Sequence, residues 1–286
     1  MWLVFAILTA LFESLKDVLI KRRIHNINPY LVAWGMVIIS CPFLVLALLF
    51  VPTPELGKNF WWALLASGVL DGAGVFLYIK ALSMGELSLI VPLVAFTPLF
   101  LLATSPIMLG EFPNEIGLLG VVLIVVGSYV LNLSARGGGF FAPFKALVKH
   151  PGSRLMLLVA FIWSVTSNVH RIGINNSSVI FWGAADSIAV SILMIPVVRL
   201  HAKQDFRALR TSFKALAPVG VCNAAMFLCM LTAINMSLVA YVISVKRLST
   251  VLSVLMGHML FKEEGLRERL LGALIMVAGV FCIALS

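Results

Sequence analysis

Long apolar runs follow one another along the whole chain and are separated only by short polar breaks. The run 116–127, for example, contains no charged residue. Hydrocarbon offers no partner for free backbone N–H and C=O groups, so a segment that crosses it must be helical or belong to a closed barrel. Barrel strands alternate in hydrophobicity over roughly ten residues, and these runs do not alternate. The sequence therefore predicts an all-α membrane protein.

About ten of these runs approach the roughly 20 residues that a transmembrane helix needs. They cover 2–20, 29–51, 60–82, 86–109, 114–133, 154–170, 176–198, 215–235, 238–260 and 267–285. The composition agrees, because 61% of the residues are hydrophobic and 12% are charged, against about 25% charged in soluble domains. We therefore expect a lipid bilayer to surround most of the protein.

The chain also matches itself when it is shifted by 152 residues. The shift places Gly68 on Gly220, Ala81 on Ala233, Met84 on Met236, Glu111 on Glu263, Gly120 on Gly272 and Gly127 on Gly279. A two-residue adjustment places Ser14 on Ser164 and Lys21 on Arg171. We therefore predict two five-helix repeats, 1–134 and 154–286, joined by a basic, Gly-rich linker, 135–153. Because five is odd, the repeats are inverted, as in many secondary transporters.

Basic residues predict the orientation. One set of loops holds Lys21, Arg22, Arg23, Arg136, Lys145, Lys149, Arg154, Arg199, Lys203, Arg207, Arg210, Lys214, Lys262, Arg267 and Arg269. The other set holds little beyond Lys58 and Arg171. The positive-inside rule makes the first set cytoplasmic, so we expect both termini outside a plasma (inner) membrane. The net charge of +9 is explained by this orientation, and no nucleic-acid reader motif accompanies it.

Two motifs close the fourth and ninth apolar segments. They are Pro92…Pro98…Leu109-Gly110-Glu111 and Leu260-Phe261-Lys262-Glu263. With the five-plus-five plan, they give a chain that resembles the EamA-type members of the drug/metabolite transporter superfamily. The resemblance implies alternating access and a central cavity lined largely by spans 1, 3, 4, 6, 8 and 9. It implies no particular substrate. Well-known ten-span members place both termini in the cytoplasm, whereas the charge count here predicts the opposite.

Lys246 and Arg247 lie well inside the ninth segment, where a charge costs roughly 2.5–3.5 kcal/mol by insertion scales. A polar stripe at helical spacing continues from Lys246 through Ser249, Thr250, Ser253 and Gly257. Arg offers a planar fork and Lys a point charge to phosphate or carboxylate groups. The stretch is also similar to the Lys-Arg pair of the plastid sugar-phosphate/phosphate translocators, which hold the substrate phosphate with it. The alternative is that buried carboxylates such as Asp17 or Asp71 neutralise both cations.

The first segment carries Glu13, Lys16 and Asp17. Burial raises the pKa of a carboxyl group and a nearby Lys lowers it, so a role in proton or exchange coupling is one interpretation. Ion pairs within the helix, Glu13–Lys16 or Asp17–Lys21, are the other.

Further polar residues lie at membrane depth. Asp71 is surrounded by glycines, which allow close helix packing, and the shift places it on Asn223; we expect both to line the cavity. Asp186 lies on a helix that the family places at the periphery, which favours a structural ion pair. In the sixth segment Trp163, Thr166, Asn168 and His170 are candidate contacts, although the position of His170 near a span end favours a surface or structural role.

The sequence therefore predicts a secondary transporter of a small metabolite, most simply an anionic one. The alternative is an exporter of amphipathic or cationic compounds or amino acids, bound by the acidic residues. No HExxH, nucleophile–base set or GxxxxGK[ST] occurs, so we expect no catalytic residues, no metal and no cofactor. The expected partners are the bilayer and the substrate, with a homodimer left open.

Overall fold

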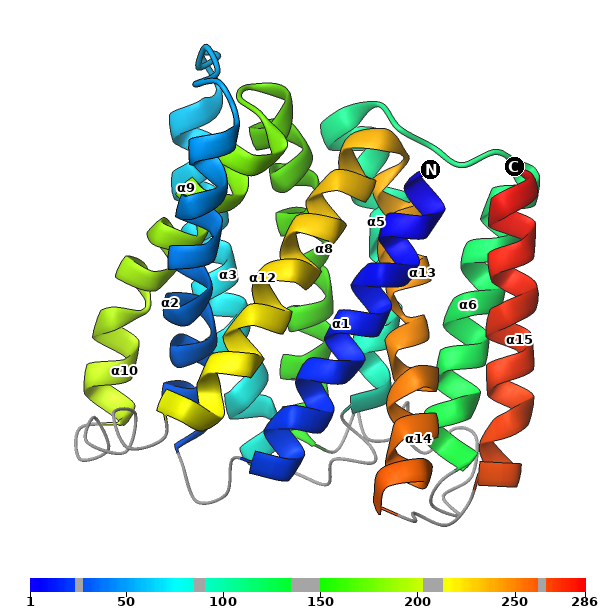
Figure 1. Cartoon of the computed structure of the whole chain (residues 1–286). Coiled ribbons are helices and arrows are strands. Elements are labelled where there is room, and N and C mark those ends of the chain that lie inside the picture. The colour runs from blue at the N-terminus through cyan, green and yellow to red at the C-terminus, as the bar shows by residue number, and fades with distance from the viewer. Residues whose placement is uncertain (24–27, 85–90, 135–149, 203–212, 262–265) are drawn as a thin grey trace.

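The computed structural model describes residues 1–23, 28–84, 91–134, 150–202, 213–261 and 266–286. Within these ranges the chain forms helices and no strand. Figure 1 shows tall helices that stand side by side, with both termini at the same end of the bundle. The predicted all-α fold is confirmed for this part of the chain.

The first half contains α1 (Trp2–Arg23), α2 (Pro29–Ala47), the 3₁₀ helix η1 (Leu48–Phe50), α3 (Phe60–Ser83), the 3₁₀ helix η2 (Val91–Phe96), α5 (Thr97–Leu109) and α6 (Glu115–Ser134). The second half contains α8 (Pro151–Asn175), α9 (Val179–Leu193), α10 (Ile195–His201), α12 (Phe213–Met236), α13 (Val239–Lys246), α14 (Leu248–Phe261) and α15 (Leu266–Leu285).

Local sequence explains several helix ends. The side chain of Asn28 accepts a hydrogen bond from the Tyr30 N–H at 3.0 Å, and the Ser178 hydroxyl accepts one from the Phe181 N–H at 3.3 Å. Each satisfies a backbone donor that has no partner within the first turn. Gly110 ends α5 with φ +70°, a left-handed conformation that glycine adopts without steric cost.

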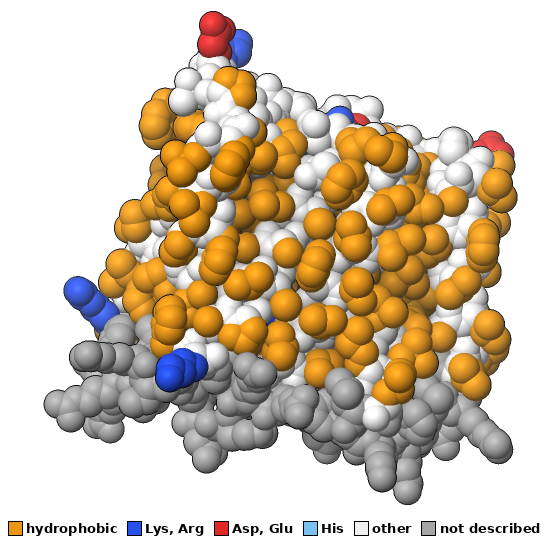
Figure 2. Space-filling view, in the orientation of Figure 1, with side chains coloured by type: hydrophobic (Ala, Val, Ile, Leu, Met, Phe, Trp, Pro, Cys, Tyr) orange, Lys and Arg blue, Asp and Glu red, His pale blue; other side chains and the backbone are white. Residues whose placement is uncertain are grey.

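Six helical segments in the described ranges are long and apolar enough to cross a membrane. They are Pro29–Phe50, Phe60–Ser83, Pro151–Asn175, Val179–His201, Leu216–Met236 and Val239–Met256. Leu93–Leu109, Glu115–Leu131 and Leu270–Leu285 are shorter apolar helices. Figure 2 shows hydrophobic side chains spread over the lateral face of the bundle, and Trp61, Leu65 and Phe281 are among the exposed ones. The protein is therefore a multi-pass membrane protein.

Helices α6 and α15 pack against each other through glycines. A Cβ added to Gly120 would lie 2.6 Å from the carbonyl oxygen of Gly279, and one added to Gly127 would lie 2.7 Å from that of Gly272. The partner residue number falls as the number along α6 rises, so the two helices run antiparallel. Small residues at both positions let the backbones approach closely, as is typical of helix pairs in membranes.

Each apolar segment predicted from the sequence holds a helix or two consecutive helices. The 86–109 segment is divided between η2 and α5, 176–198 between α9 and α10, and 238–260 between α13 and α14. Pro98 in the first turn of α5 accounts for the first break, because proline lacks the N–H that a continuous helix would use. Residues 135–149 of the predicted linker lie outside the described residues, and α8 begins at Pro151.

Candidate functional site

Two adjoining chambers lie between the helices. The small chamber has a volume of about 280 Å³ and the large chamber about 620 Å³. Both are lined by Glu13, Lys16, Val75, Trp163 and Arg247. The spans that the family resemblance implied all contribute, and α2 and α9 contribute as well. The charged residues predicted at membrane depth therefore surround a common space.

The small chamber lies near the middle of the bundle, whereas the large chamber extends away from the chain termini. Ile20 in the second half of α1, Pro29 at the start of α2 and Leu82 near the end of α3 line the large chamber. These parts of the helices lie at the end of the bundle opposite the termini (Figure 1). The large chamber therefore reaches toward that end.

Lys246 and Arg247 lie where α13 gives way to α14. The Lys246 Nζ is 3.5 Å from the Glu13 Oε1, so this cation pairs with Glu13 of α1 rather than with Asp17 or Asp71. The Arg247 Nη2 donates to the hydroxyl of Thr97 at 2.8 Å. Thr97 is the first residue of α5, so the break in one half of the chain contacts the break in the other.

The polar stripe predicted from Lys246 onward is divided in the structure. Lys246 lines the small chamber, and Ser249 and Thr250 line the large one. Ser253 is not among the described residues that line either chamber. Its hydroxyl instead donates to the Ser14 hydroxyl of α1 at 3.1 Å. The change from α13 to α14 after Arg247 interrupts a single helical face, which explains the division.

The other predicted contact residues face the small chamber. Asp71, Asn223 and Trp163 all line it. The Asn223 side-chain amide donates to the Ser40 hydroxyl at 3.1 Å. The Trp163 ring lies 5.4 Å from the ring of Tyr78, measured between centroids, at 35°. These residues give the chambers an aromatic and amide wall beside their charges.

The three charged residues of α1 are distributed between the chambers. Glu13 and Lys16 line both, and Asp17 lines the large chamber. Glu13 takes part in the inter-helix pair with Lys246. The predicted Asp17–Lys21 pair involves a side chain outside those the structure describes.

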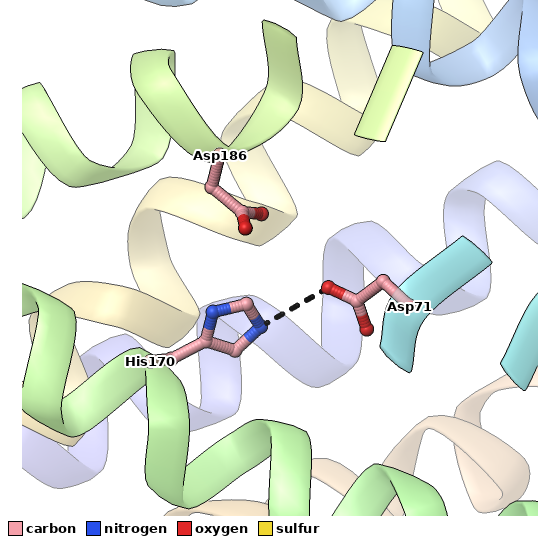
Figure 3. Close-up of side chains that lie close together, drawn as sticks. All are labelled: Asp71, His170 and Asp186. Atoms are coloured by element: carbon pink, nitrogen blue, oxygen red, sulfur yellow. Dashed lines mark ion pairs between the residues drawn. The ribbon is translucent and has the colours of Figure 1, made fainter. Parts of the chain in front are cut away.

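A second cluster, formed by Asp71, His170 and Asp186, was not predicted from the sequence. Figure 3 shows that Asp71 and Asp186 approach His170 from different helices. The His170 Nε2 is 3.6 Å from the Asp71 Oδ2, and one ligand atom from each residue lies within 4.8 Å of the others. His170 is buried rather than at the surface, and Asp186 is buried in the lining of the small chamber. Of the two roles expected for His170, surface or structural, burial excludes the first. Asp186 faces the small chamber, although we expected its helix at the periphery and favoured a structural ion pair.

Neighbouring side chains fix the orientation of His170. The indole N–H of Trp182 donates to its Nδ1 at 3.1 Å, and Ser67 donates a short hydrogen bond to Asp186. The ring of Phe227 lies 5.5 Å from the imidazole at 73°. Trp182 is fully buried and lies directly over Gly173, where an added Cβ would approach its ring to 2.2 Å. The cluster is therefore held by packed residues.

The end of the bundle nearest the termini is joined by polar contacts. The Arg171 Nε is 3.6 Å from the Glu111 Oε1, and Arg171 also donates to the carbonyl oxygen of Ile234. The Val239 N–H donates to the Glu111 Oε2 at 3.4 Å. These contacts connect α5, α8, α12 and α13 at the end of the bundle opposite the large chamber.

Apolar helices around chambers lined with charges and aromatic rings define the class of integral membrane proteins that bind a small solute between their spans. The chain matches the EamA-like transporter family over residues 1–133 and 150–285, and it belongs to that family. This membership confirms the resemblance seen in the sequence.

Two relatives are named as uncharacterized transporters, one from Synechocystis sp. and one from Sinorhizobium sp.. Each is 28% identical over 137 residues, which is 46% of this chain. The match spans 40% of the Synechocystis protein and 95% of the Sinorhizobium protein. A crystal structure that is 17% identical aligns with a TM-score of 0.76 over 99% of this chain and 96% of the other, which shows a shared fold. The family and the named relatives are transporters, not enzymes.

Proposed function

We propose that the protein is a secondary transporter of a small anionic metabolite that carries a phosphate or carboxylate group. The observation that supports an anion is a buried hydrogen-bond donor on the Arg247 guanidinium. Its Nε–H is buried and has no hydrogen-bond partner among the described residues. A buried donor without a partner costs about 1–3 kcal/mol, and more when it is charged. A ligand oxygen that accepts from this guanidinium would remove that cost.

Lys246 supports the same proposal. It lines the small chamber together with Arg247, and its Nζ is paired with Glu13. An anion bound to Arg247 would lie close to Lys246 and would compete with Glu13 for it. The substrate would therefore change the contacts between α1 and α13, two helices that belong to different halves of the chain.

We further propose ten transmembrane helices in two inverted five-helix repeats. The antiparallel contact of α6 with α15 supports this arrangement, because the 152-residue shift places Gly120 on Gly272 and Gly127 on Gly279. The helix breaks support it too. The same shift places Phe96, the last residue of η2, on Leu248, the first residue of α14. Paired broken helices at the middle of two repeats are a recurring site for substrates in secondary transporters.

Alternating access follows from this arrangement. The contacts between Glu111 and Arg171 close the end near the termini, and the large chamber extends toward the other end. Arg199 near the end of α10 and Lys214 near the start of α12 lie at that other end. The positive-inside rule would make it cytoplasmic, so the protein would be open to the cytoplasm here with both termini outside. The basic residues at 135–149, 203–212 and 262–265 lie outside the described residues.

Export of cationic or amphipathic compounds is the second candidate. The large chamber supports it, because Asp17 shares its lining with Tyr78 and Trp163. A carboxylate beside two aromatic rings is a favourable site for an organic cation. The two candidates differ in which residues bind the substrate.

Thermal unfolding of the purified protein with a panel of ligands distinguishes them. The panel would contain sulfate and phosphorylated, carboxylated, zwitterionic and cationic metabolites. A ligand at 100 times its Kd stabilises the folded state by about 2.7 kcal/mol. We expect anions to stabilise the parent protein, and Arg247→Ala to remove this effect. Arg247→Lys should retain only part of it, because lysine keeps the charge and loses the planar fork.

The matched control is Arg199→Ala, because Arg199 is exposed and lies outside both chambers. It should respond to anions as the parent does. Counterflow of the stabilising anion in liposomes would then test transport. Stabilisation by cations alone, unchanged in Arg247→Ala and lost in Asp17→Asn, would overturn the anion proposal in favour of the second candidate.

A further inference from the structure

The cluster of Asp71, His170 and Asp186 has a chemistry that the anion site does not use. Two carboxylates and an imidazole from α3, α8 and α9 meet at the wall of the small chamber. Their ligand atoms lie within 4.8 Å of one another. Such a group either holds a metal ion or shares protons, and the hydrogen bonds around it decide between the two.

The partner of the His170 Nδ1 argues against a metal. Trp182 has an N–H that can only donate, and it donates to this nitrogen at 3.1 Å, a shorter contact than that of Nδ1 with the Ser67 hydroxyl at 3.5 Å. Nδ1 is therefore an acceptor and the imidazole is neutral, so its one proton lies on Nε2. Nε2 faces Asp71 at 3.6 Å. A protonated nitrogen has no lone pair for a metal, and here it faces a carboxylate oxygen from just beyond hydrogen-bond distance.

The charges around the chambers argue for one additional proton. With His170 neutral, the two linings hold four carboxylates, Glu13, Asp17, Asp71 and Asp186, and three cations, Lys16, Lys246 and Arg247. Lys246 is paired with Glu13. Among the described residues, neither Asp71 nor Asp186 has a Lys or Arg within ion-pair distance. Asp186 is buried and Asp71 is half-buried, and two carboxylates so close together away from bulk water do not both ionise readily.

We propose that Asp71 and Asp186, oriented by His170 and Ser67, form a proton-binding site that couples proton binding to anion binding in the small chamber. This inference rests on the proposed transport of an anion. The proton bound to either carboxyl oxygen comes from water in the chamber and returns to it. When it leaves, the chamber gains one negative charge and holds an anion less tightly. Because such coupling is reciprocal, a bound anion also holds the proton, so the two would be carried together.

The titratable groups that face the cluster come from five helices. They are Asp71 on α3, Asp186 on α9, Glu13 and Lys16 on α1, Lys246 on α13, Arg247 between α13 and α14, and Cys41 on α2, whose Sγ is 3.4 Å from the Ser191 hydroxyl of α9. From α12, the side chain that contacts His170 is the uncharged ring of Phe227. Lys246, Lys16 and Arg247 are thus the cations of the small chamber that can respond to the charge of the cluster.

Infrared spectroscopy tests the proton directly and needs no substrate. The protein would carry aspartate labelled with ¹³C at the side-chain carboxyl, in a detergent without ester groups. At neutral pH we expect the C=O stretch of a protonated aspartic acid in the parent protein. The band should be lost in Asp71→Asn/Asp186→Asn and retained in Asp17→Asn, the matched change in the large chamber.

The parent spectrum alone can overturn the proposal, so the proposal does not depend on the folding of the double variant. Absence of the band in the parent would overturn it. So would a band that persists in a folded double variant, or a stoichiometric metal ion that elemental analysis finds in the parent and not in that variant.

Binding of sulfate tests the coupling, because sulfate keeps its charge between pH 6 and pH 8. In the parent, we expect sulfate binding to tighten as the pH falls, by up to about tenfold per pH unit for one linked proton. In the double variant binding should be independent of pH. Binding that is equally pH-dependent in both proteins would overturn the coupling. If sulfate binds neither protein, the anion proposal fails, and the infrared band still decides whether the proton site exists.

Discussion

Gly127 on α6 and Gly279 on α15 occupy equivalent positions under the 152-residue shift, and so do Asp71 on α3 and Asn223 on α12. The two pairs behave differently. A Cβ added to either glycine would lie 2.7 Å from a glycine carbonyl oxygen of the opposite helix. Asp71 instead joins a cluster with His170, whereas Asn223 donates to a serine of α2.

The difference shows that helix packing is symmetric between the two halves, whereas the binding site is not. Where two equivalent helices pack closely, each needs a small residue at the point of closest approach. Equivalent positions that line the chambers need not carry the same residue type, since a ligand is bound by whichever side chains surround it. We therefore expect changes at the α6–α15 contact to affect stability most, and changes at α12 to affect the protein least.

The largest expected effect comes from Gly127→Ala. The new Cβ would lie 2.7 Å from the Gly272 carbonyl oxygen and from the Met276 backbone nitrogen, and neither atom can move without its helix. Overpacking typically costs about 1–3 kcal/mol, and we expect a loss of about 3 kcal/mol here. Thermal unfolding in detergent measures it.

Gly72→Ala is the matched control, because the same change at Gly72 meets only the Met194 Cγ at 3.8 Å, an ordinary contact. Both glycines are inside helices, so the gain in helix propensity cancels between the two variants. Equal stability of the two would contradict the tight α6–α15 contact.

Trp182→Phe should have the next largest effect. It removes the donor to the His170 Nδ1 and leaves this buried acceptor with the longer contact to the Ser67 hydroxyl at 3.5 Å, which we expect to cost about 2 kcal/mol. A purely structural role would change only stability, so the second measurement is the ¹⁵N spectrum of labelled histidine. We expect His170, identified through His170→Gln, to be protonated at Nε2 in the parent and at either nitrogen in the variant. A parent protonated at Nδ1 would contradict the tautomer on which the proton site depends.

Glu111→Gln addresses the closed end of the bundle. It weakens the contacts of Glu111 with Arg171 and with the Val239 N–H. The two charged side chains are 20% and 18% exposed, so the pair lies between surface pairs and buried ones, and we expect a loss of about 1 kcal/mol. Hydrogen exchange at the start of α13 should then become about fivefold faster. Glu55→Gln, at an exposed position, should leave it unchanged, and no change in Glu111→Gln would contradict the closing role.

Much of the fold could be predicted because lipid leaves few alternatives for an apolar segment. The ends of α3 and α6 lie within a residue or two of the predicted ones, and the break before α5 lies beside Pro98. The break at Arg247 has no proline or glycine beside it. It depends on contacts between helices, such as that of Arg247 with Thr97, which a single sequence does not record.

The site was predictable where a charged residue lies at membrane depth, because a charge in lipid is costly and is usually functional or paired. That argument found Lys246 and Arg247, which line the small chamber. It did not find the cluster, because His170 and Asp186 come from distant segments whose spacing follows no helical period. The signals were Asp71 and Asp186, two charges at membrane depth, but the family plan placed the helix of Asp186 at the periphery.

Asn223→Ala should have the smallest effect, and it tests the difference between the halves most directly. The Asn223 amide donates to the Ser40 hydroxyl, but that hydroxyl keeps its own bonds to the Met36 and Gly220 carbonyl oxygens at 2.7 and 2.9 Å. We therefore expect a loss of about 0.5 kcal/mol, the low end for one hydrogen bond, and sulfate binding that keeps its pH dependence. Asp71→Asn, which makes the two positions alike, should lose that dependence. If Asn223→Ala instead abolished it, the proton chemistry would belong to both halves, and the division between a shared scaffold and a one-sided site would be wrong.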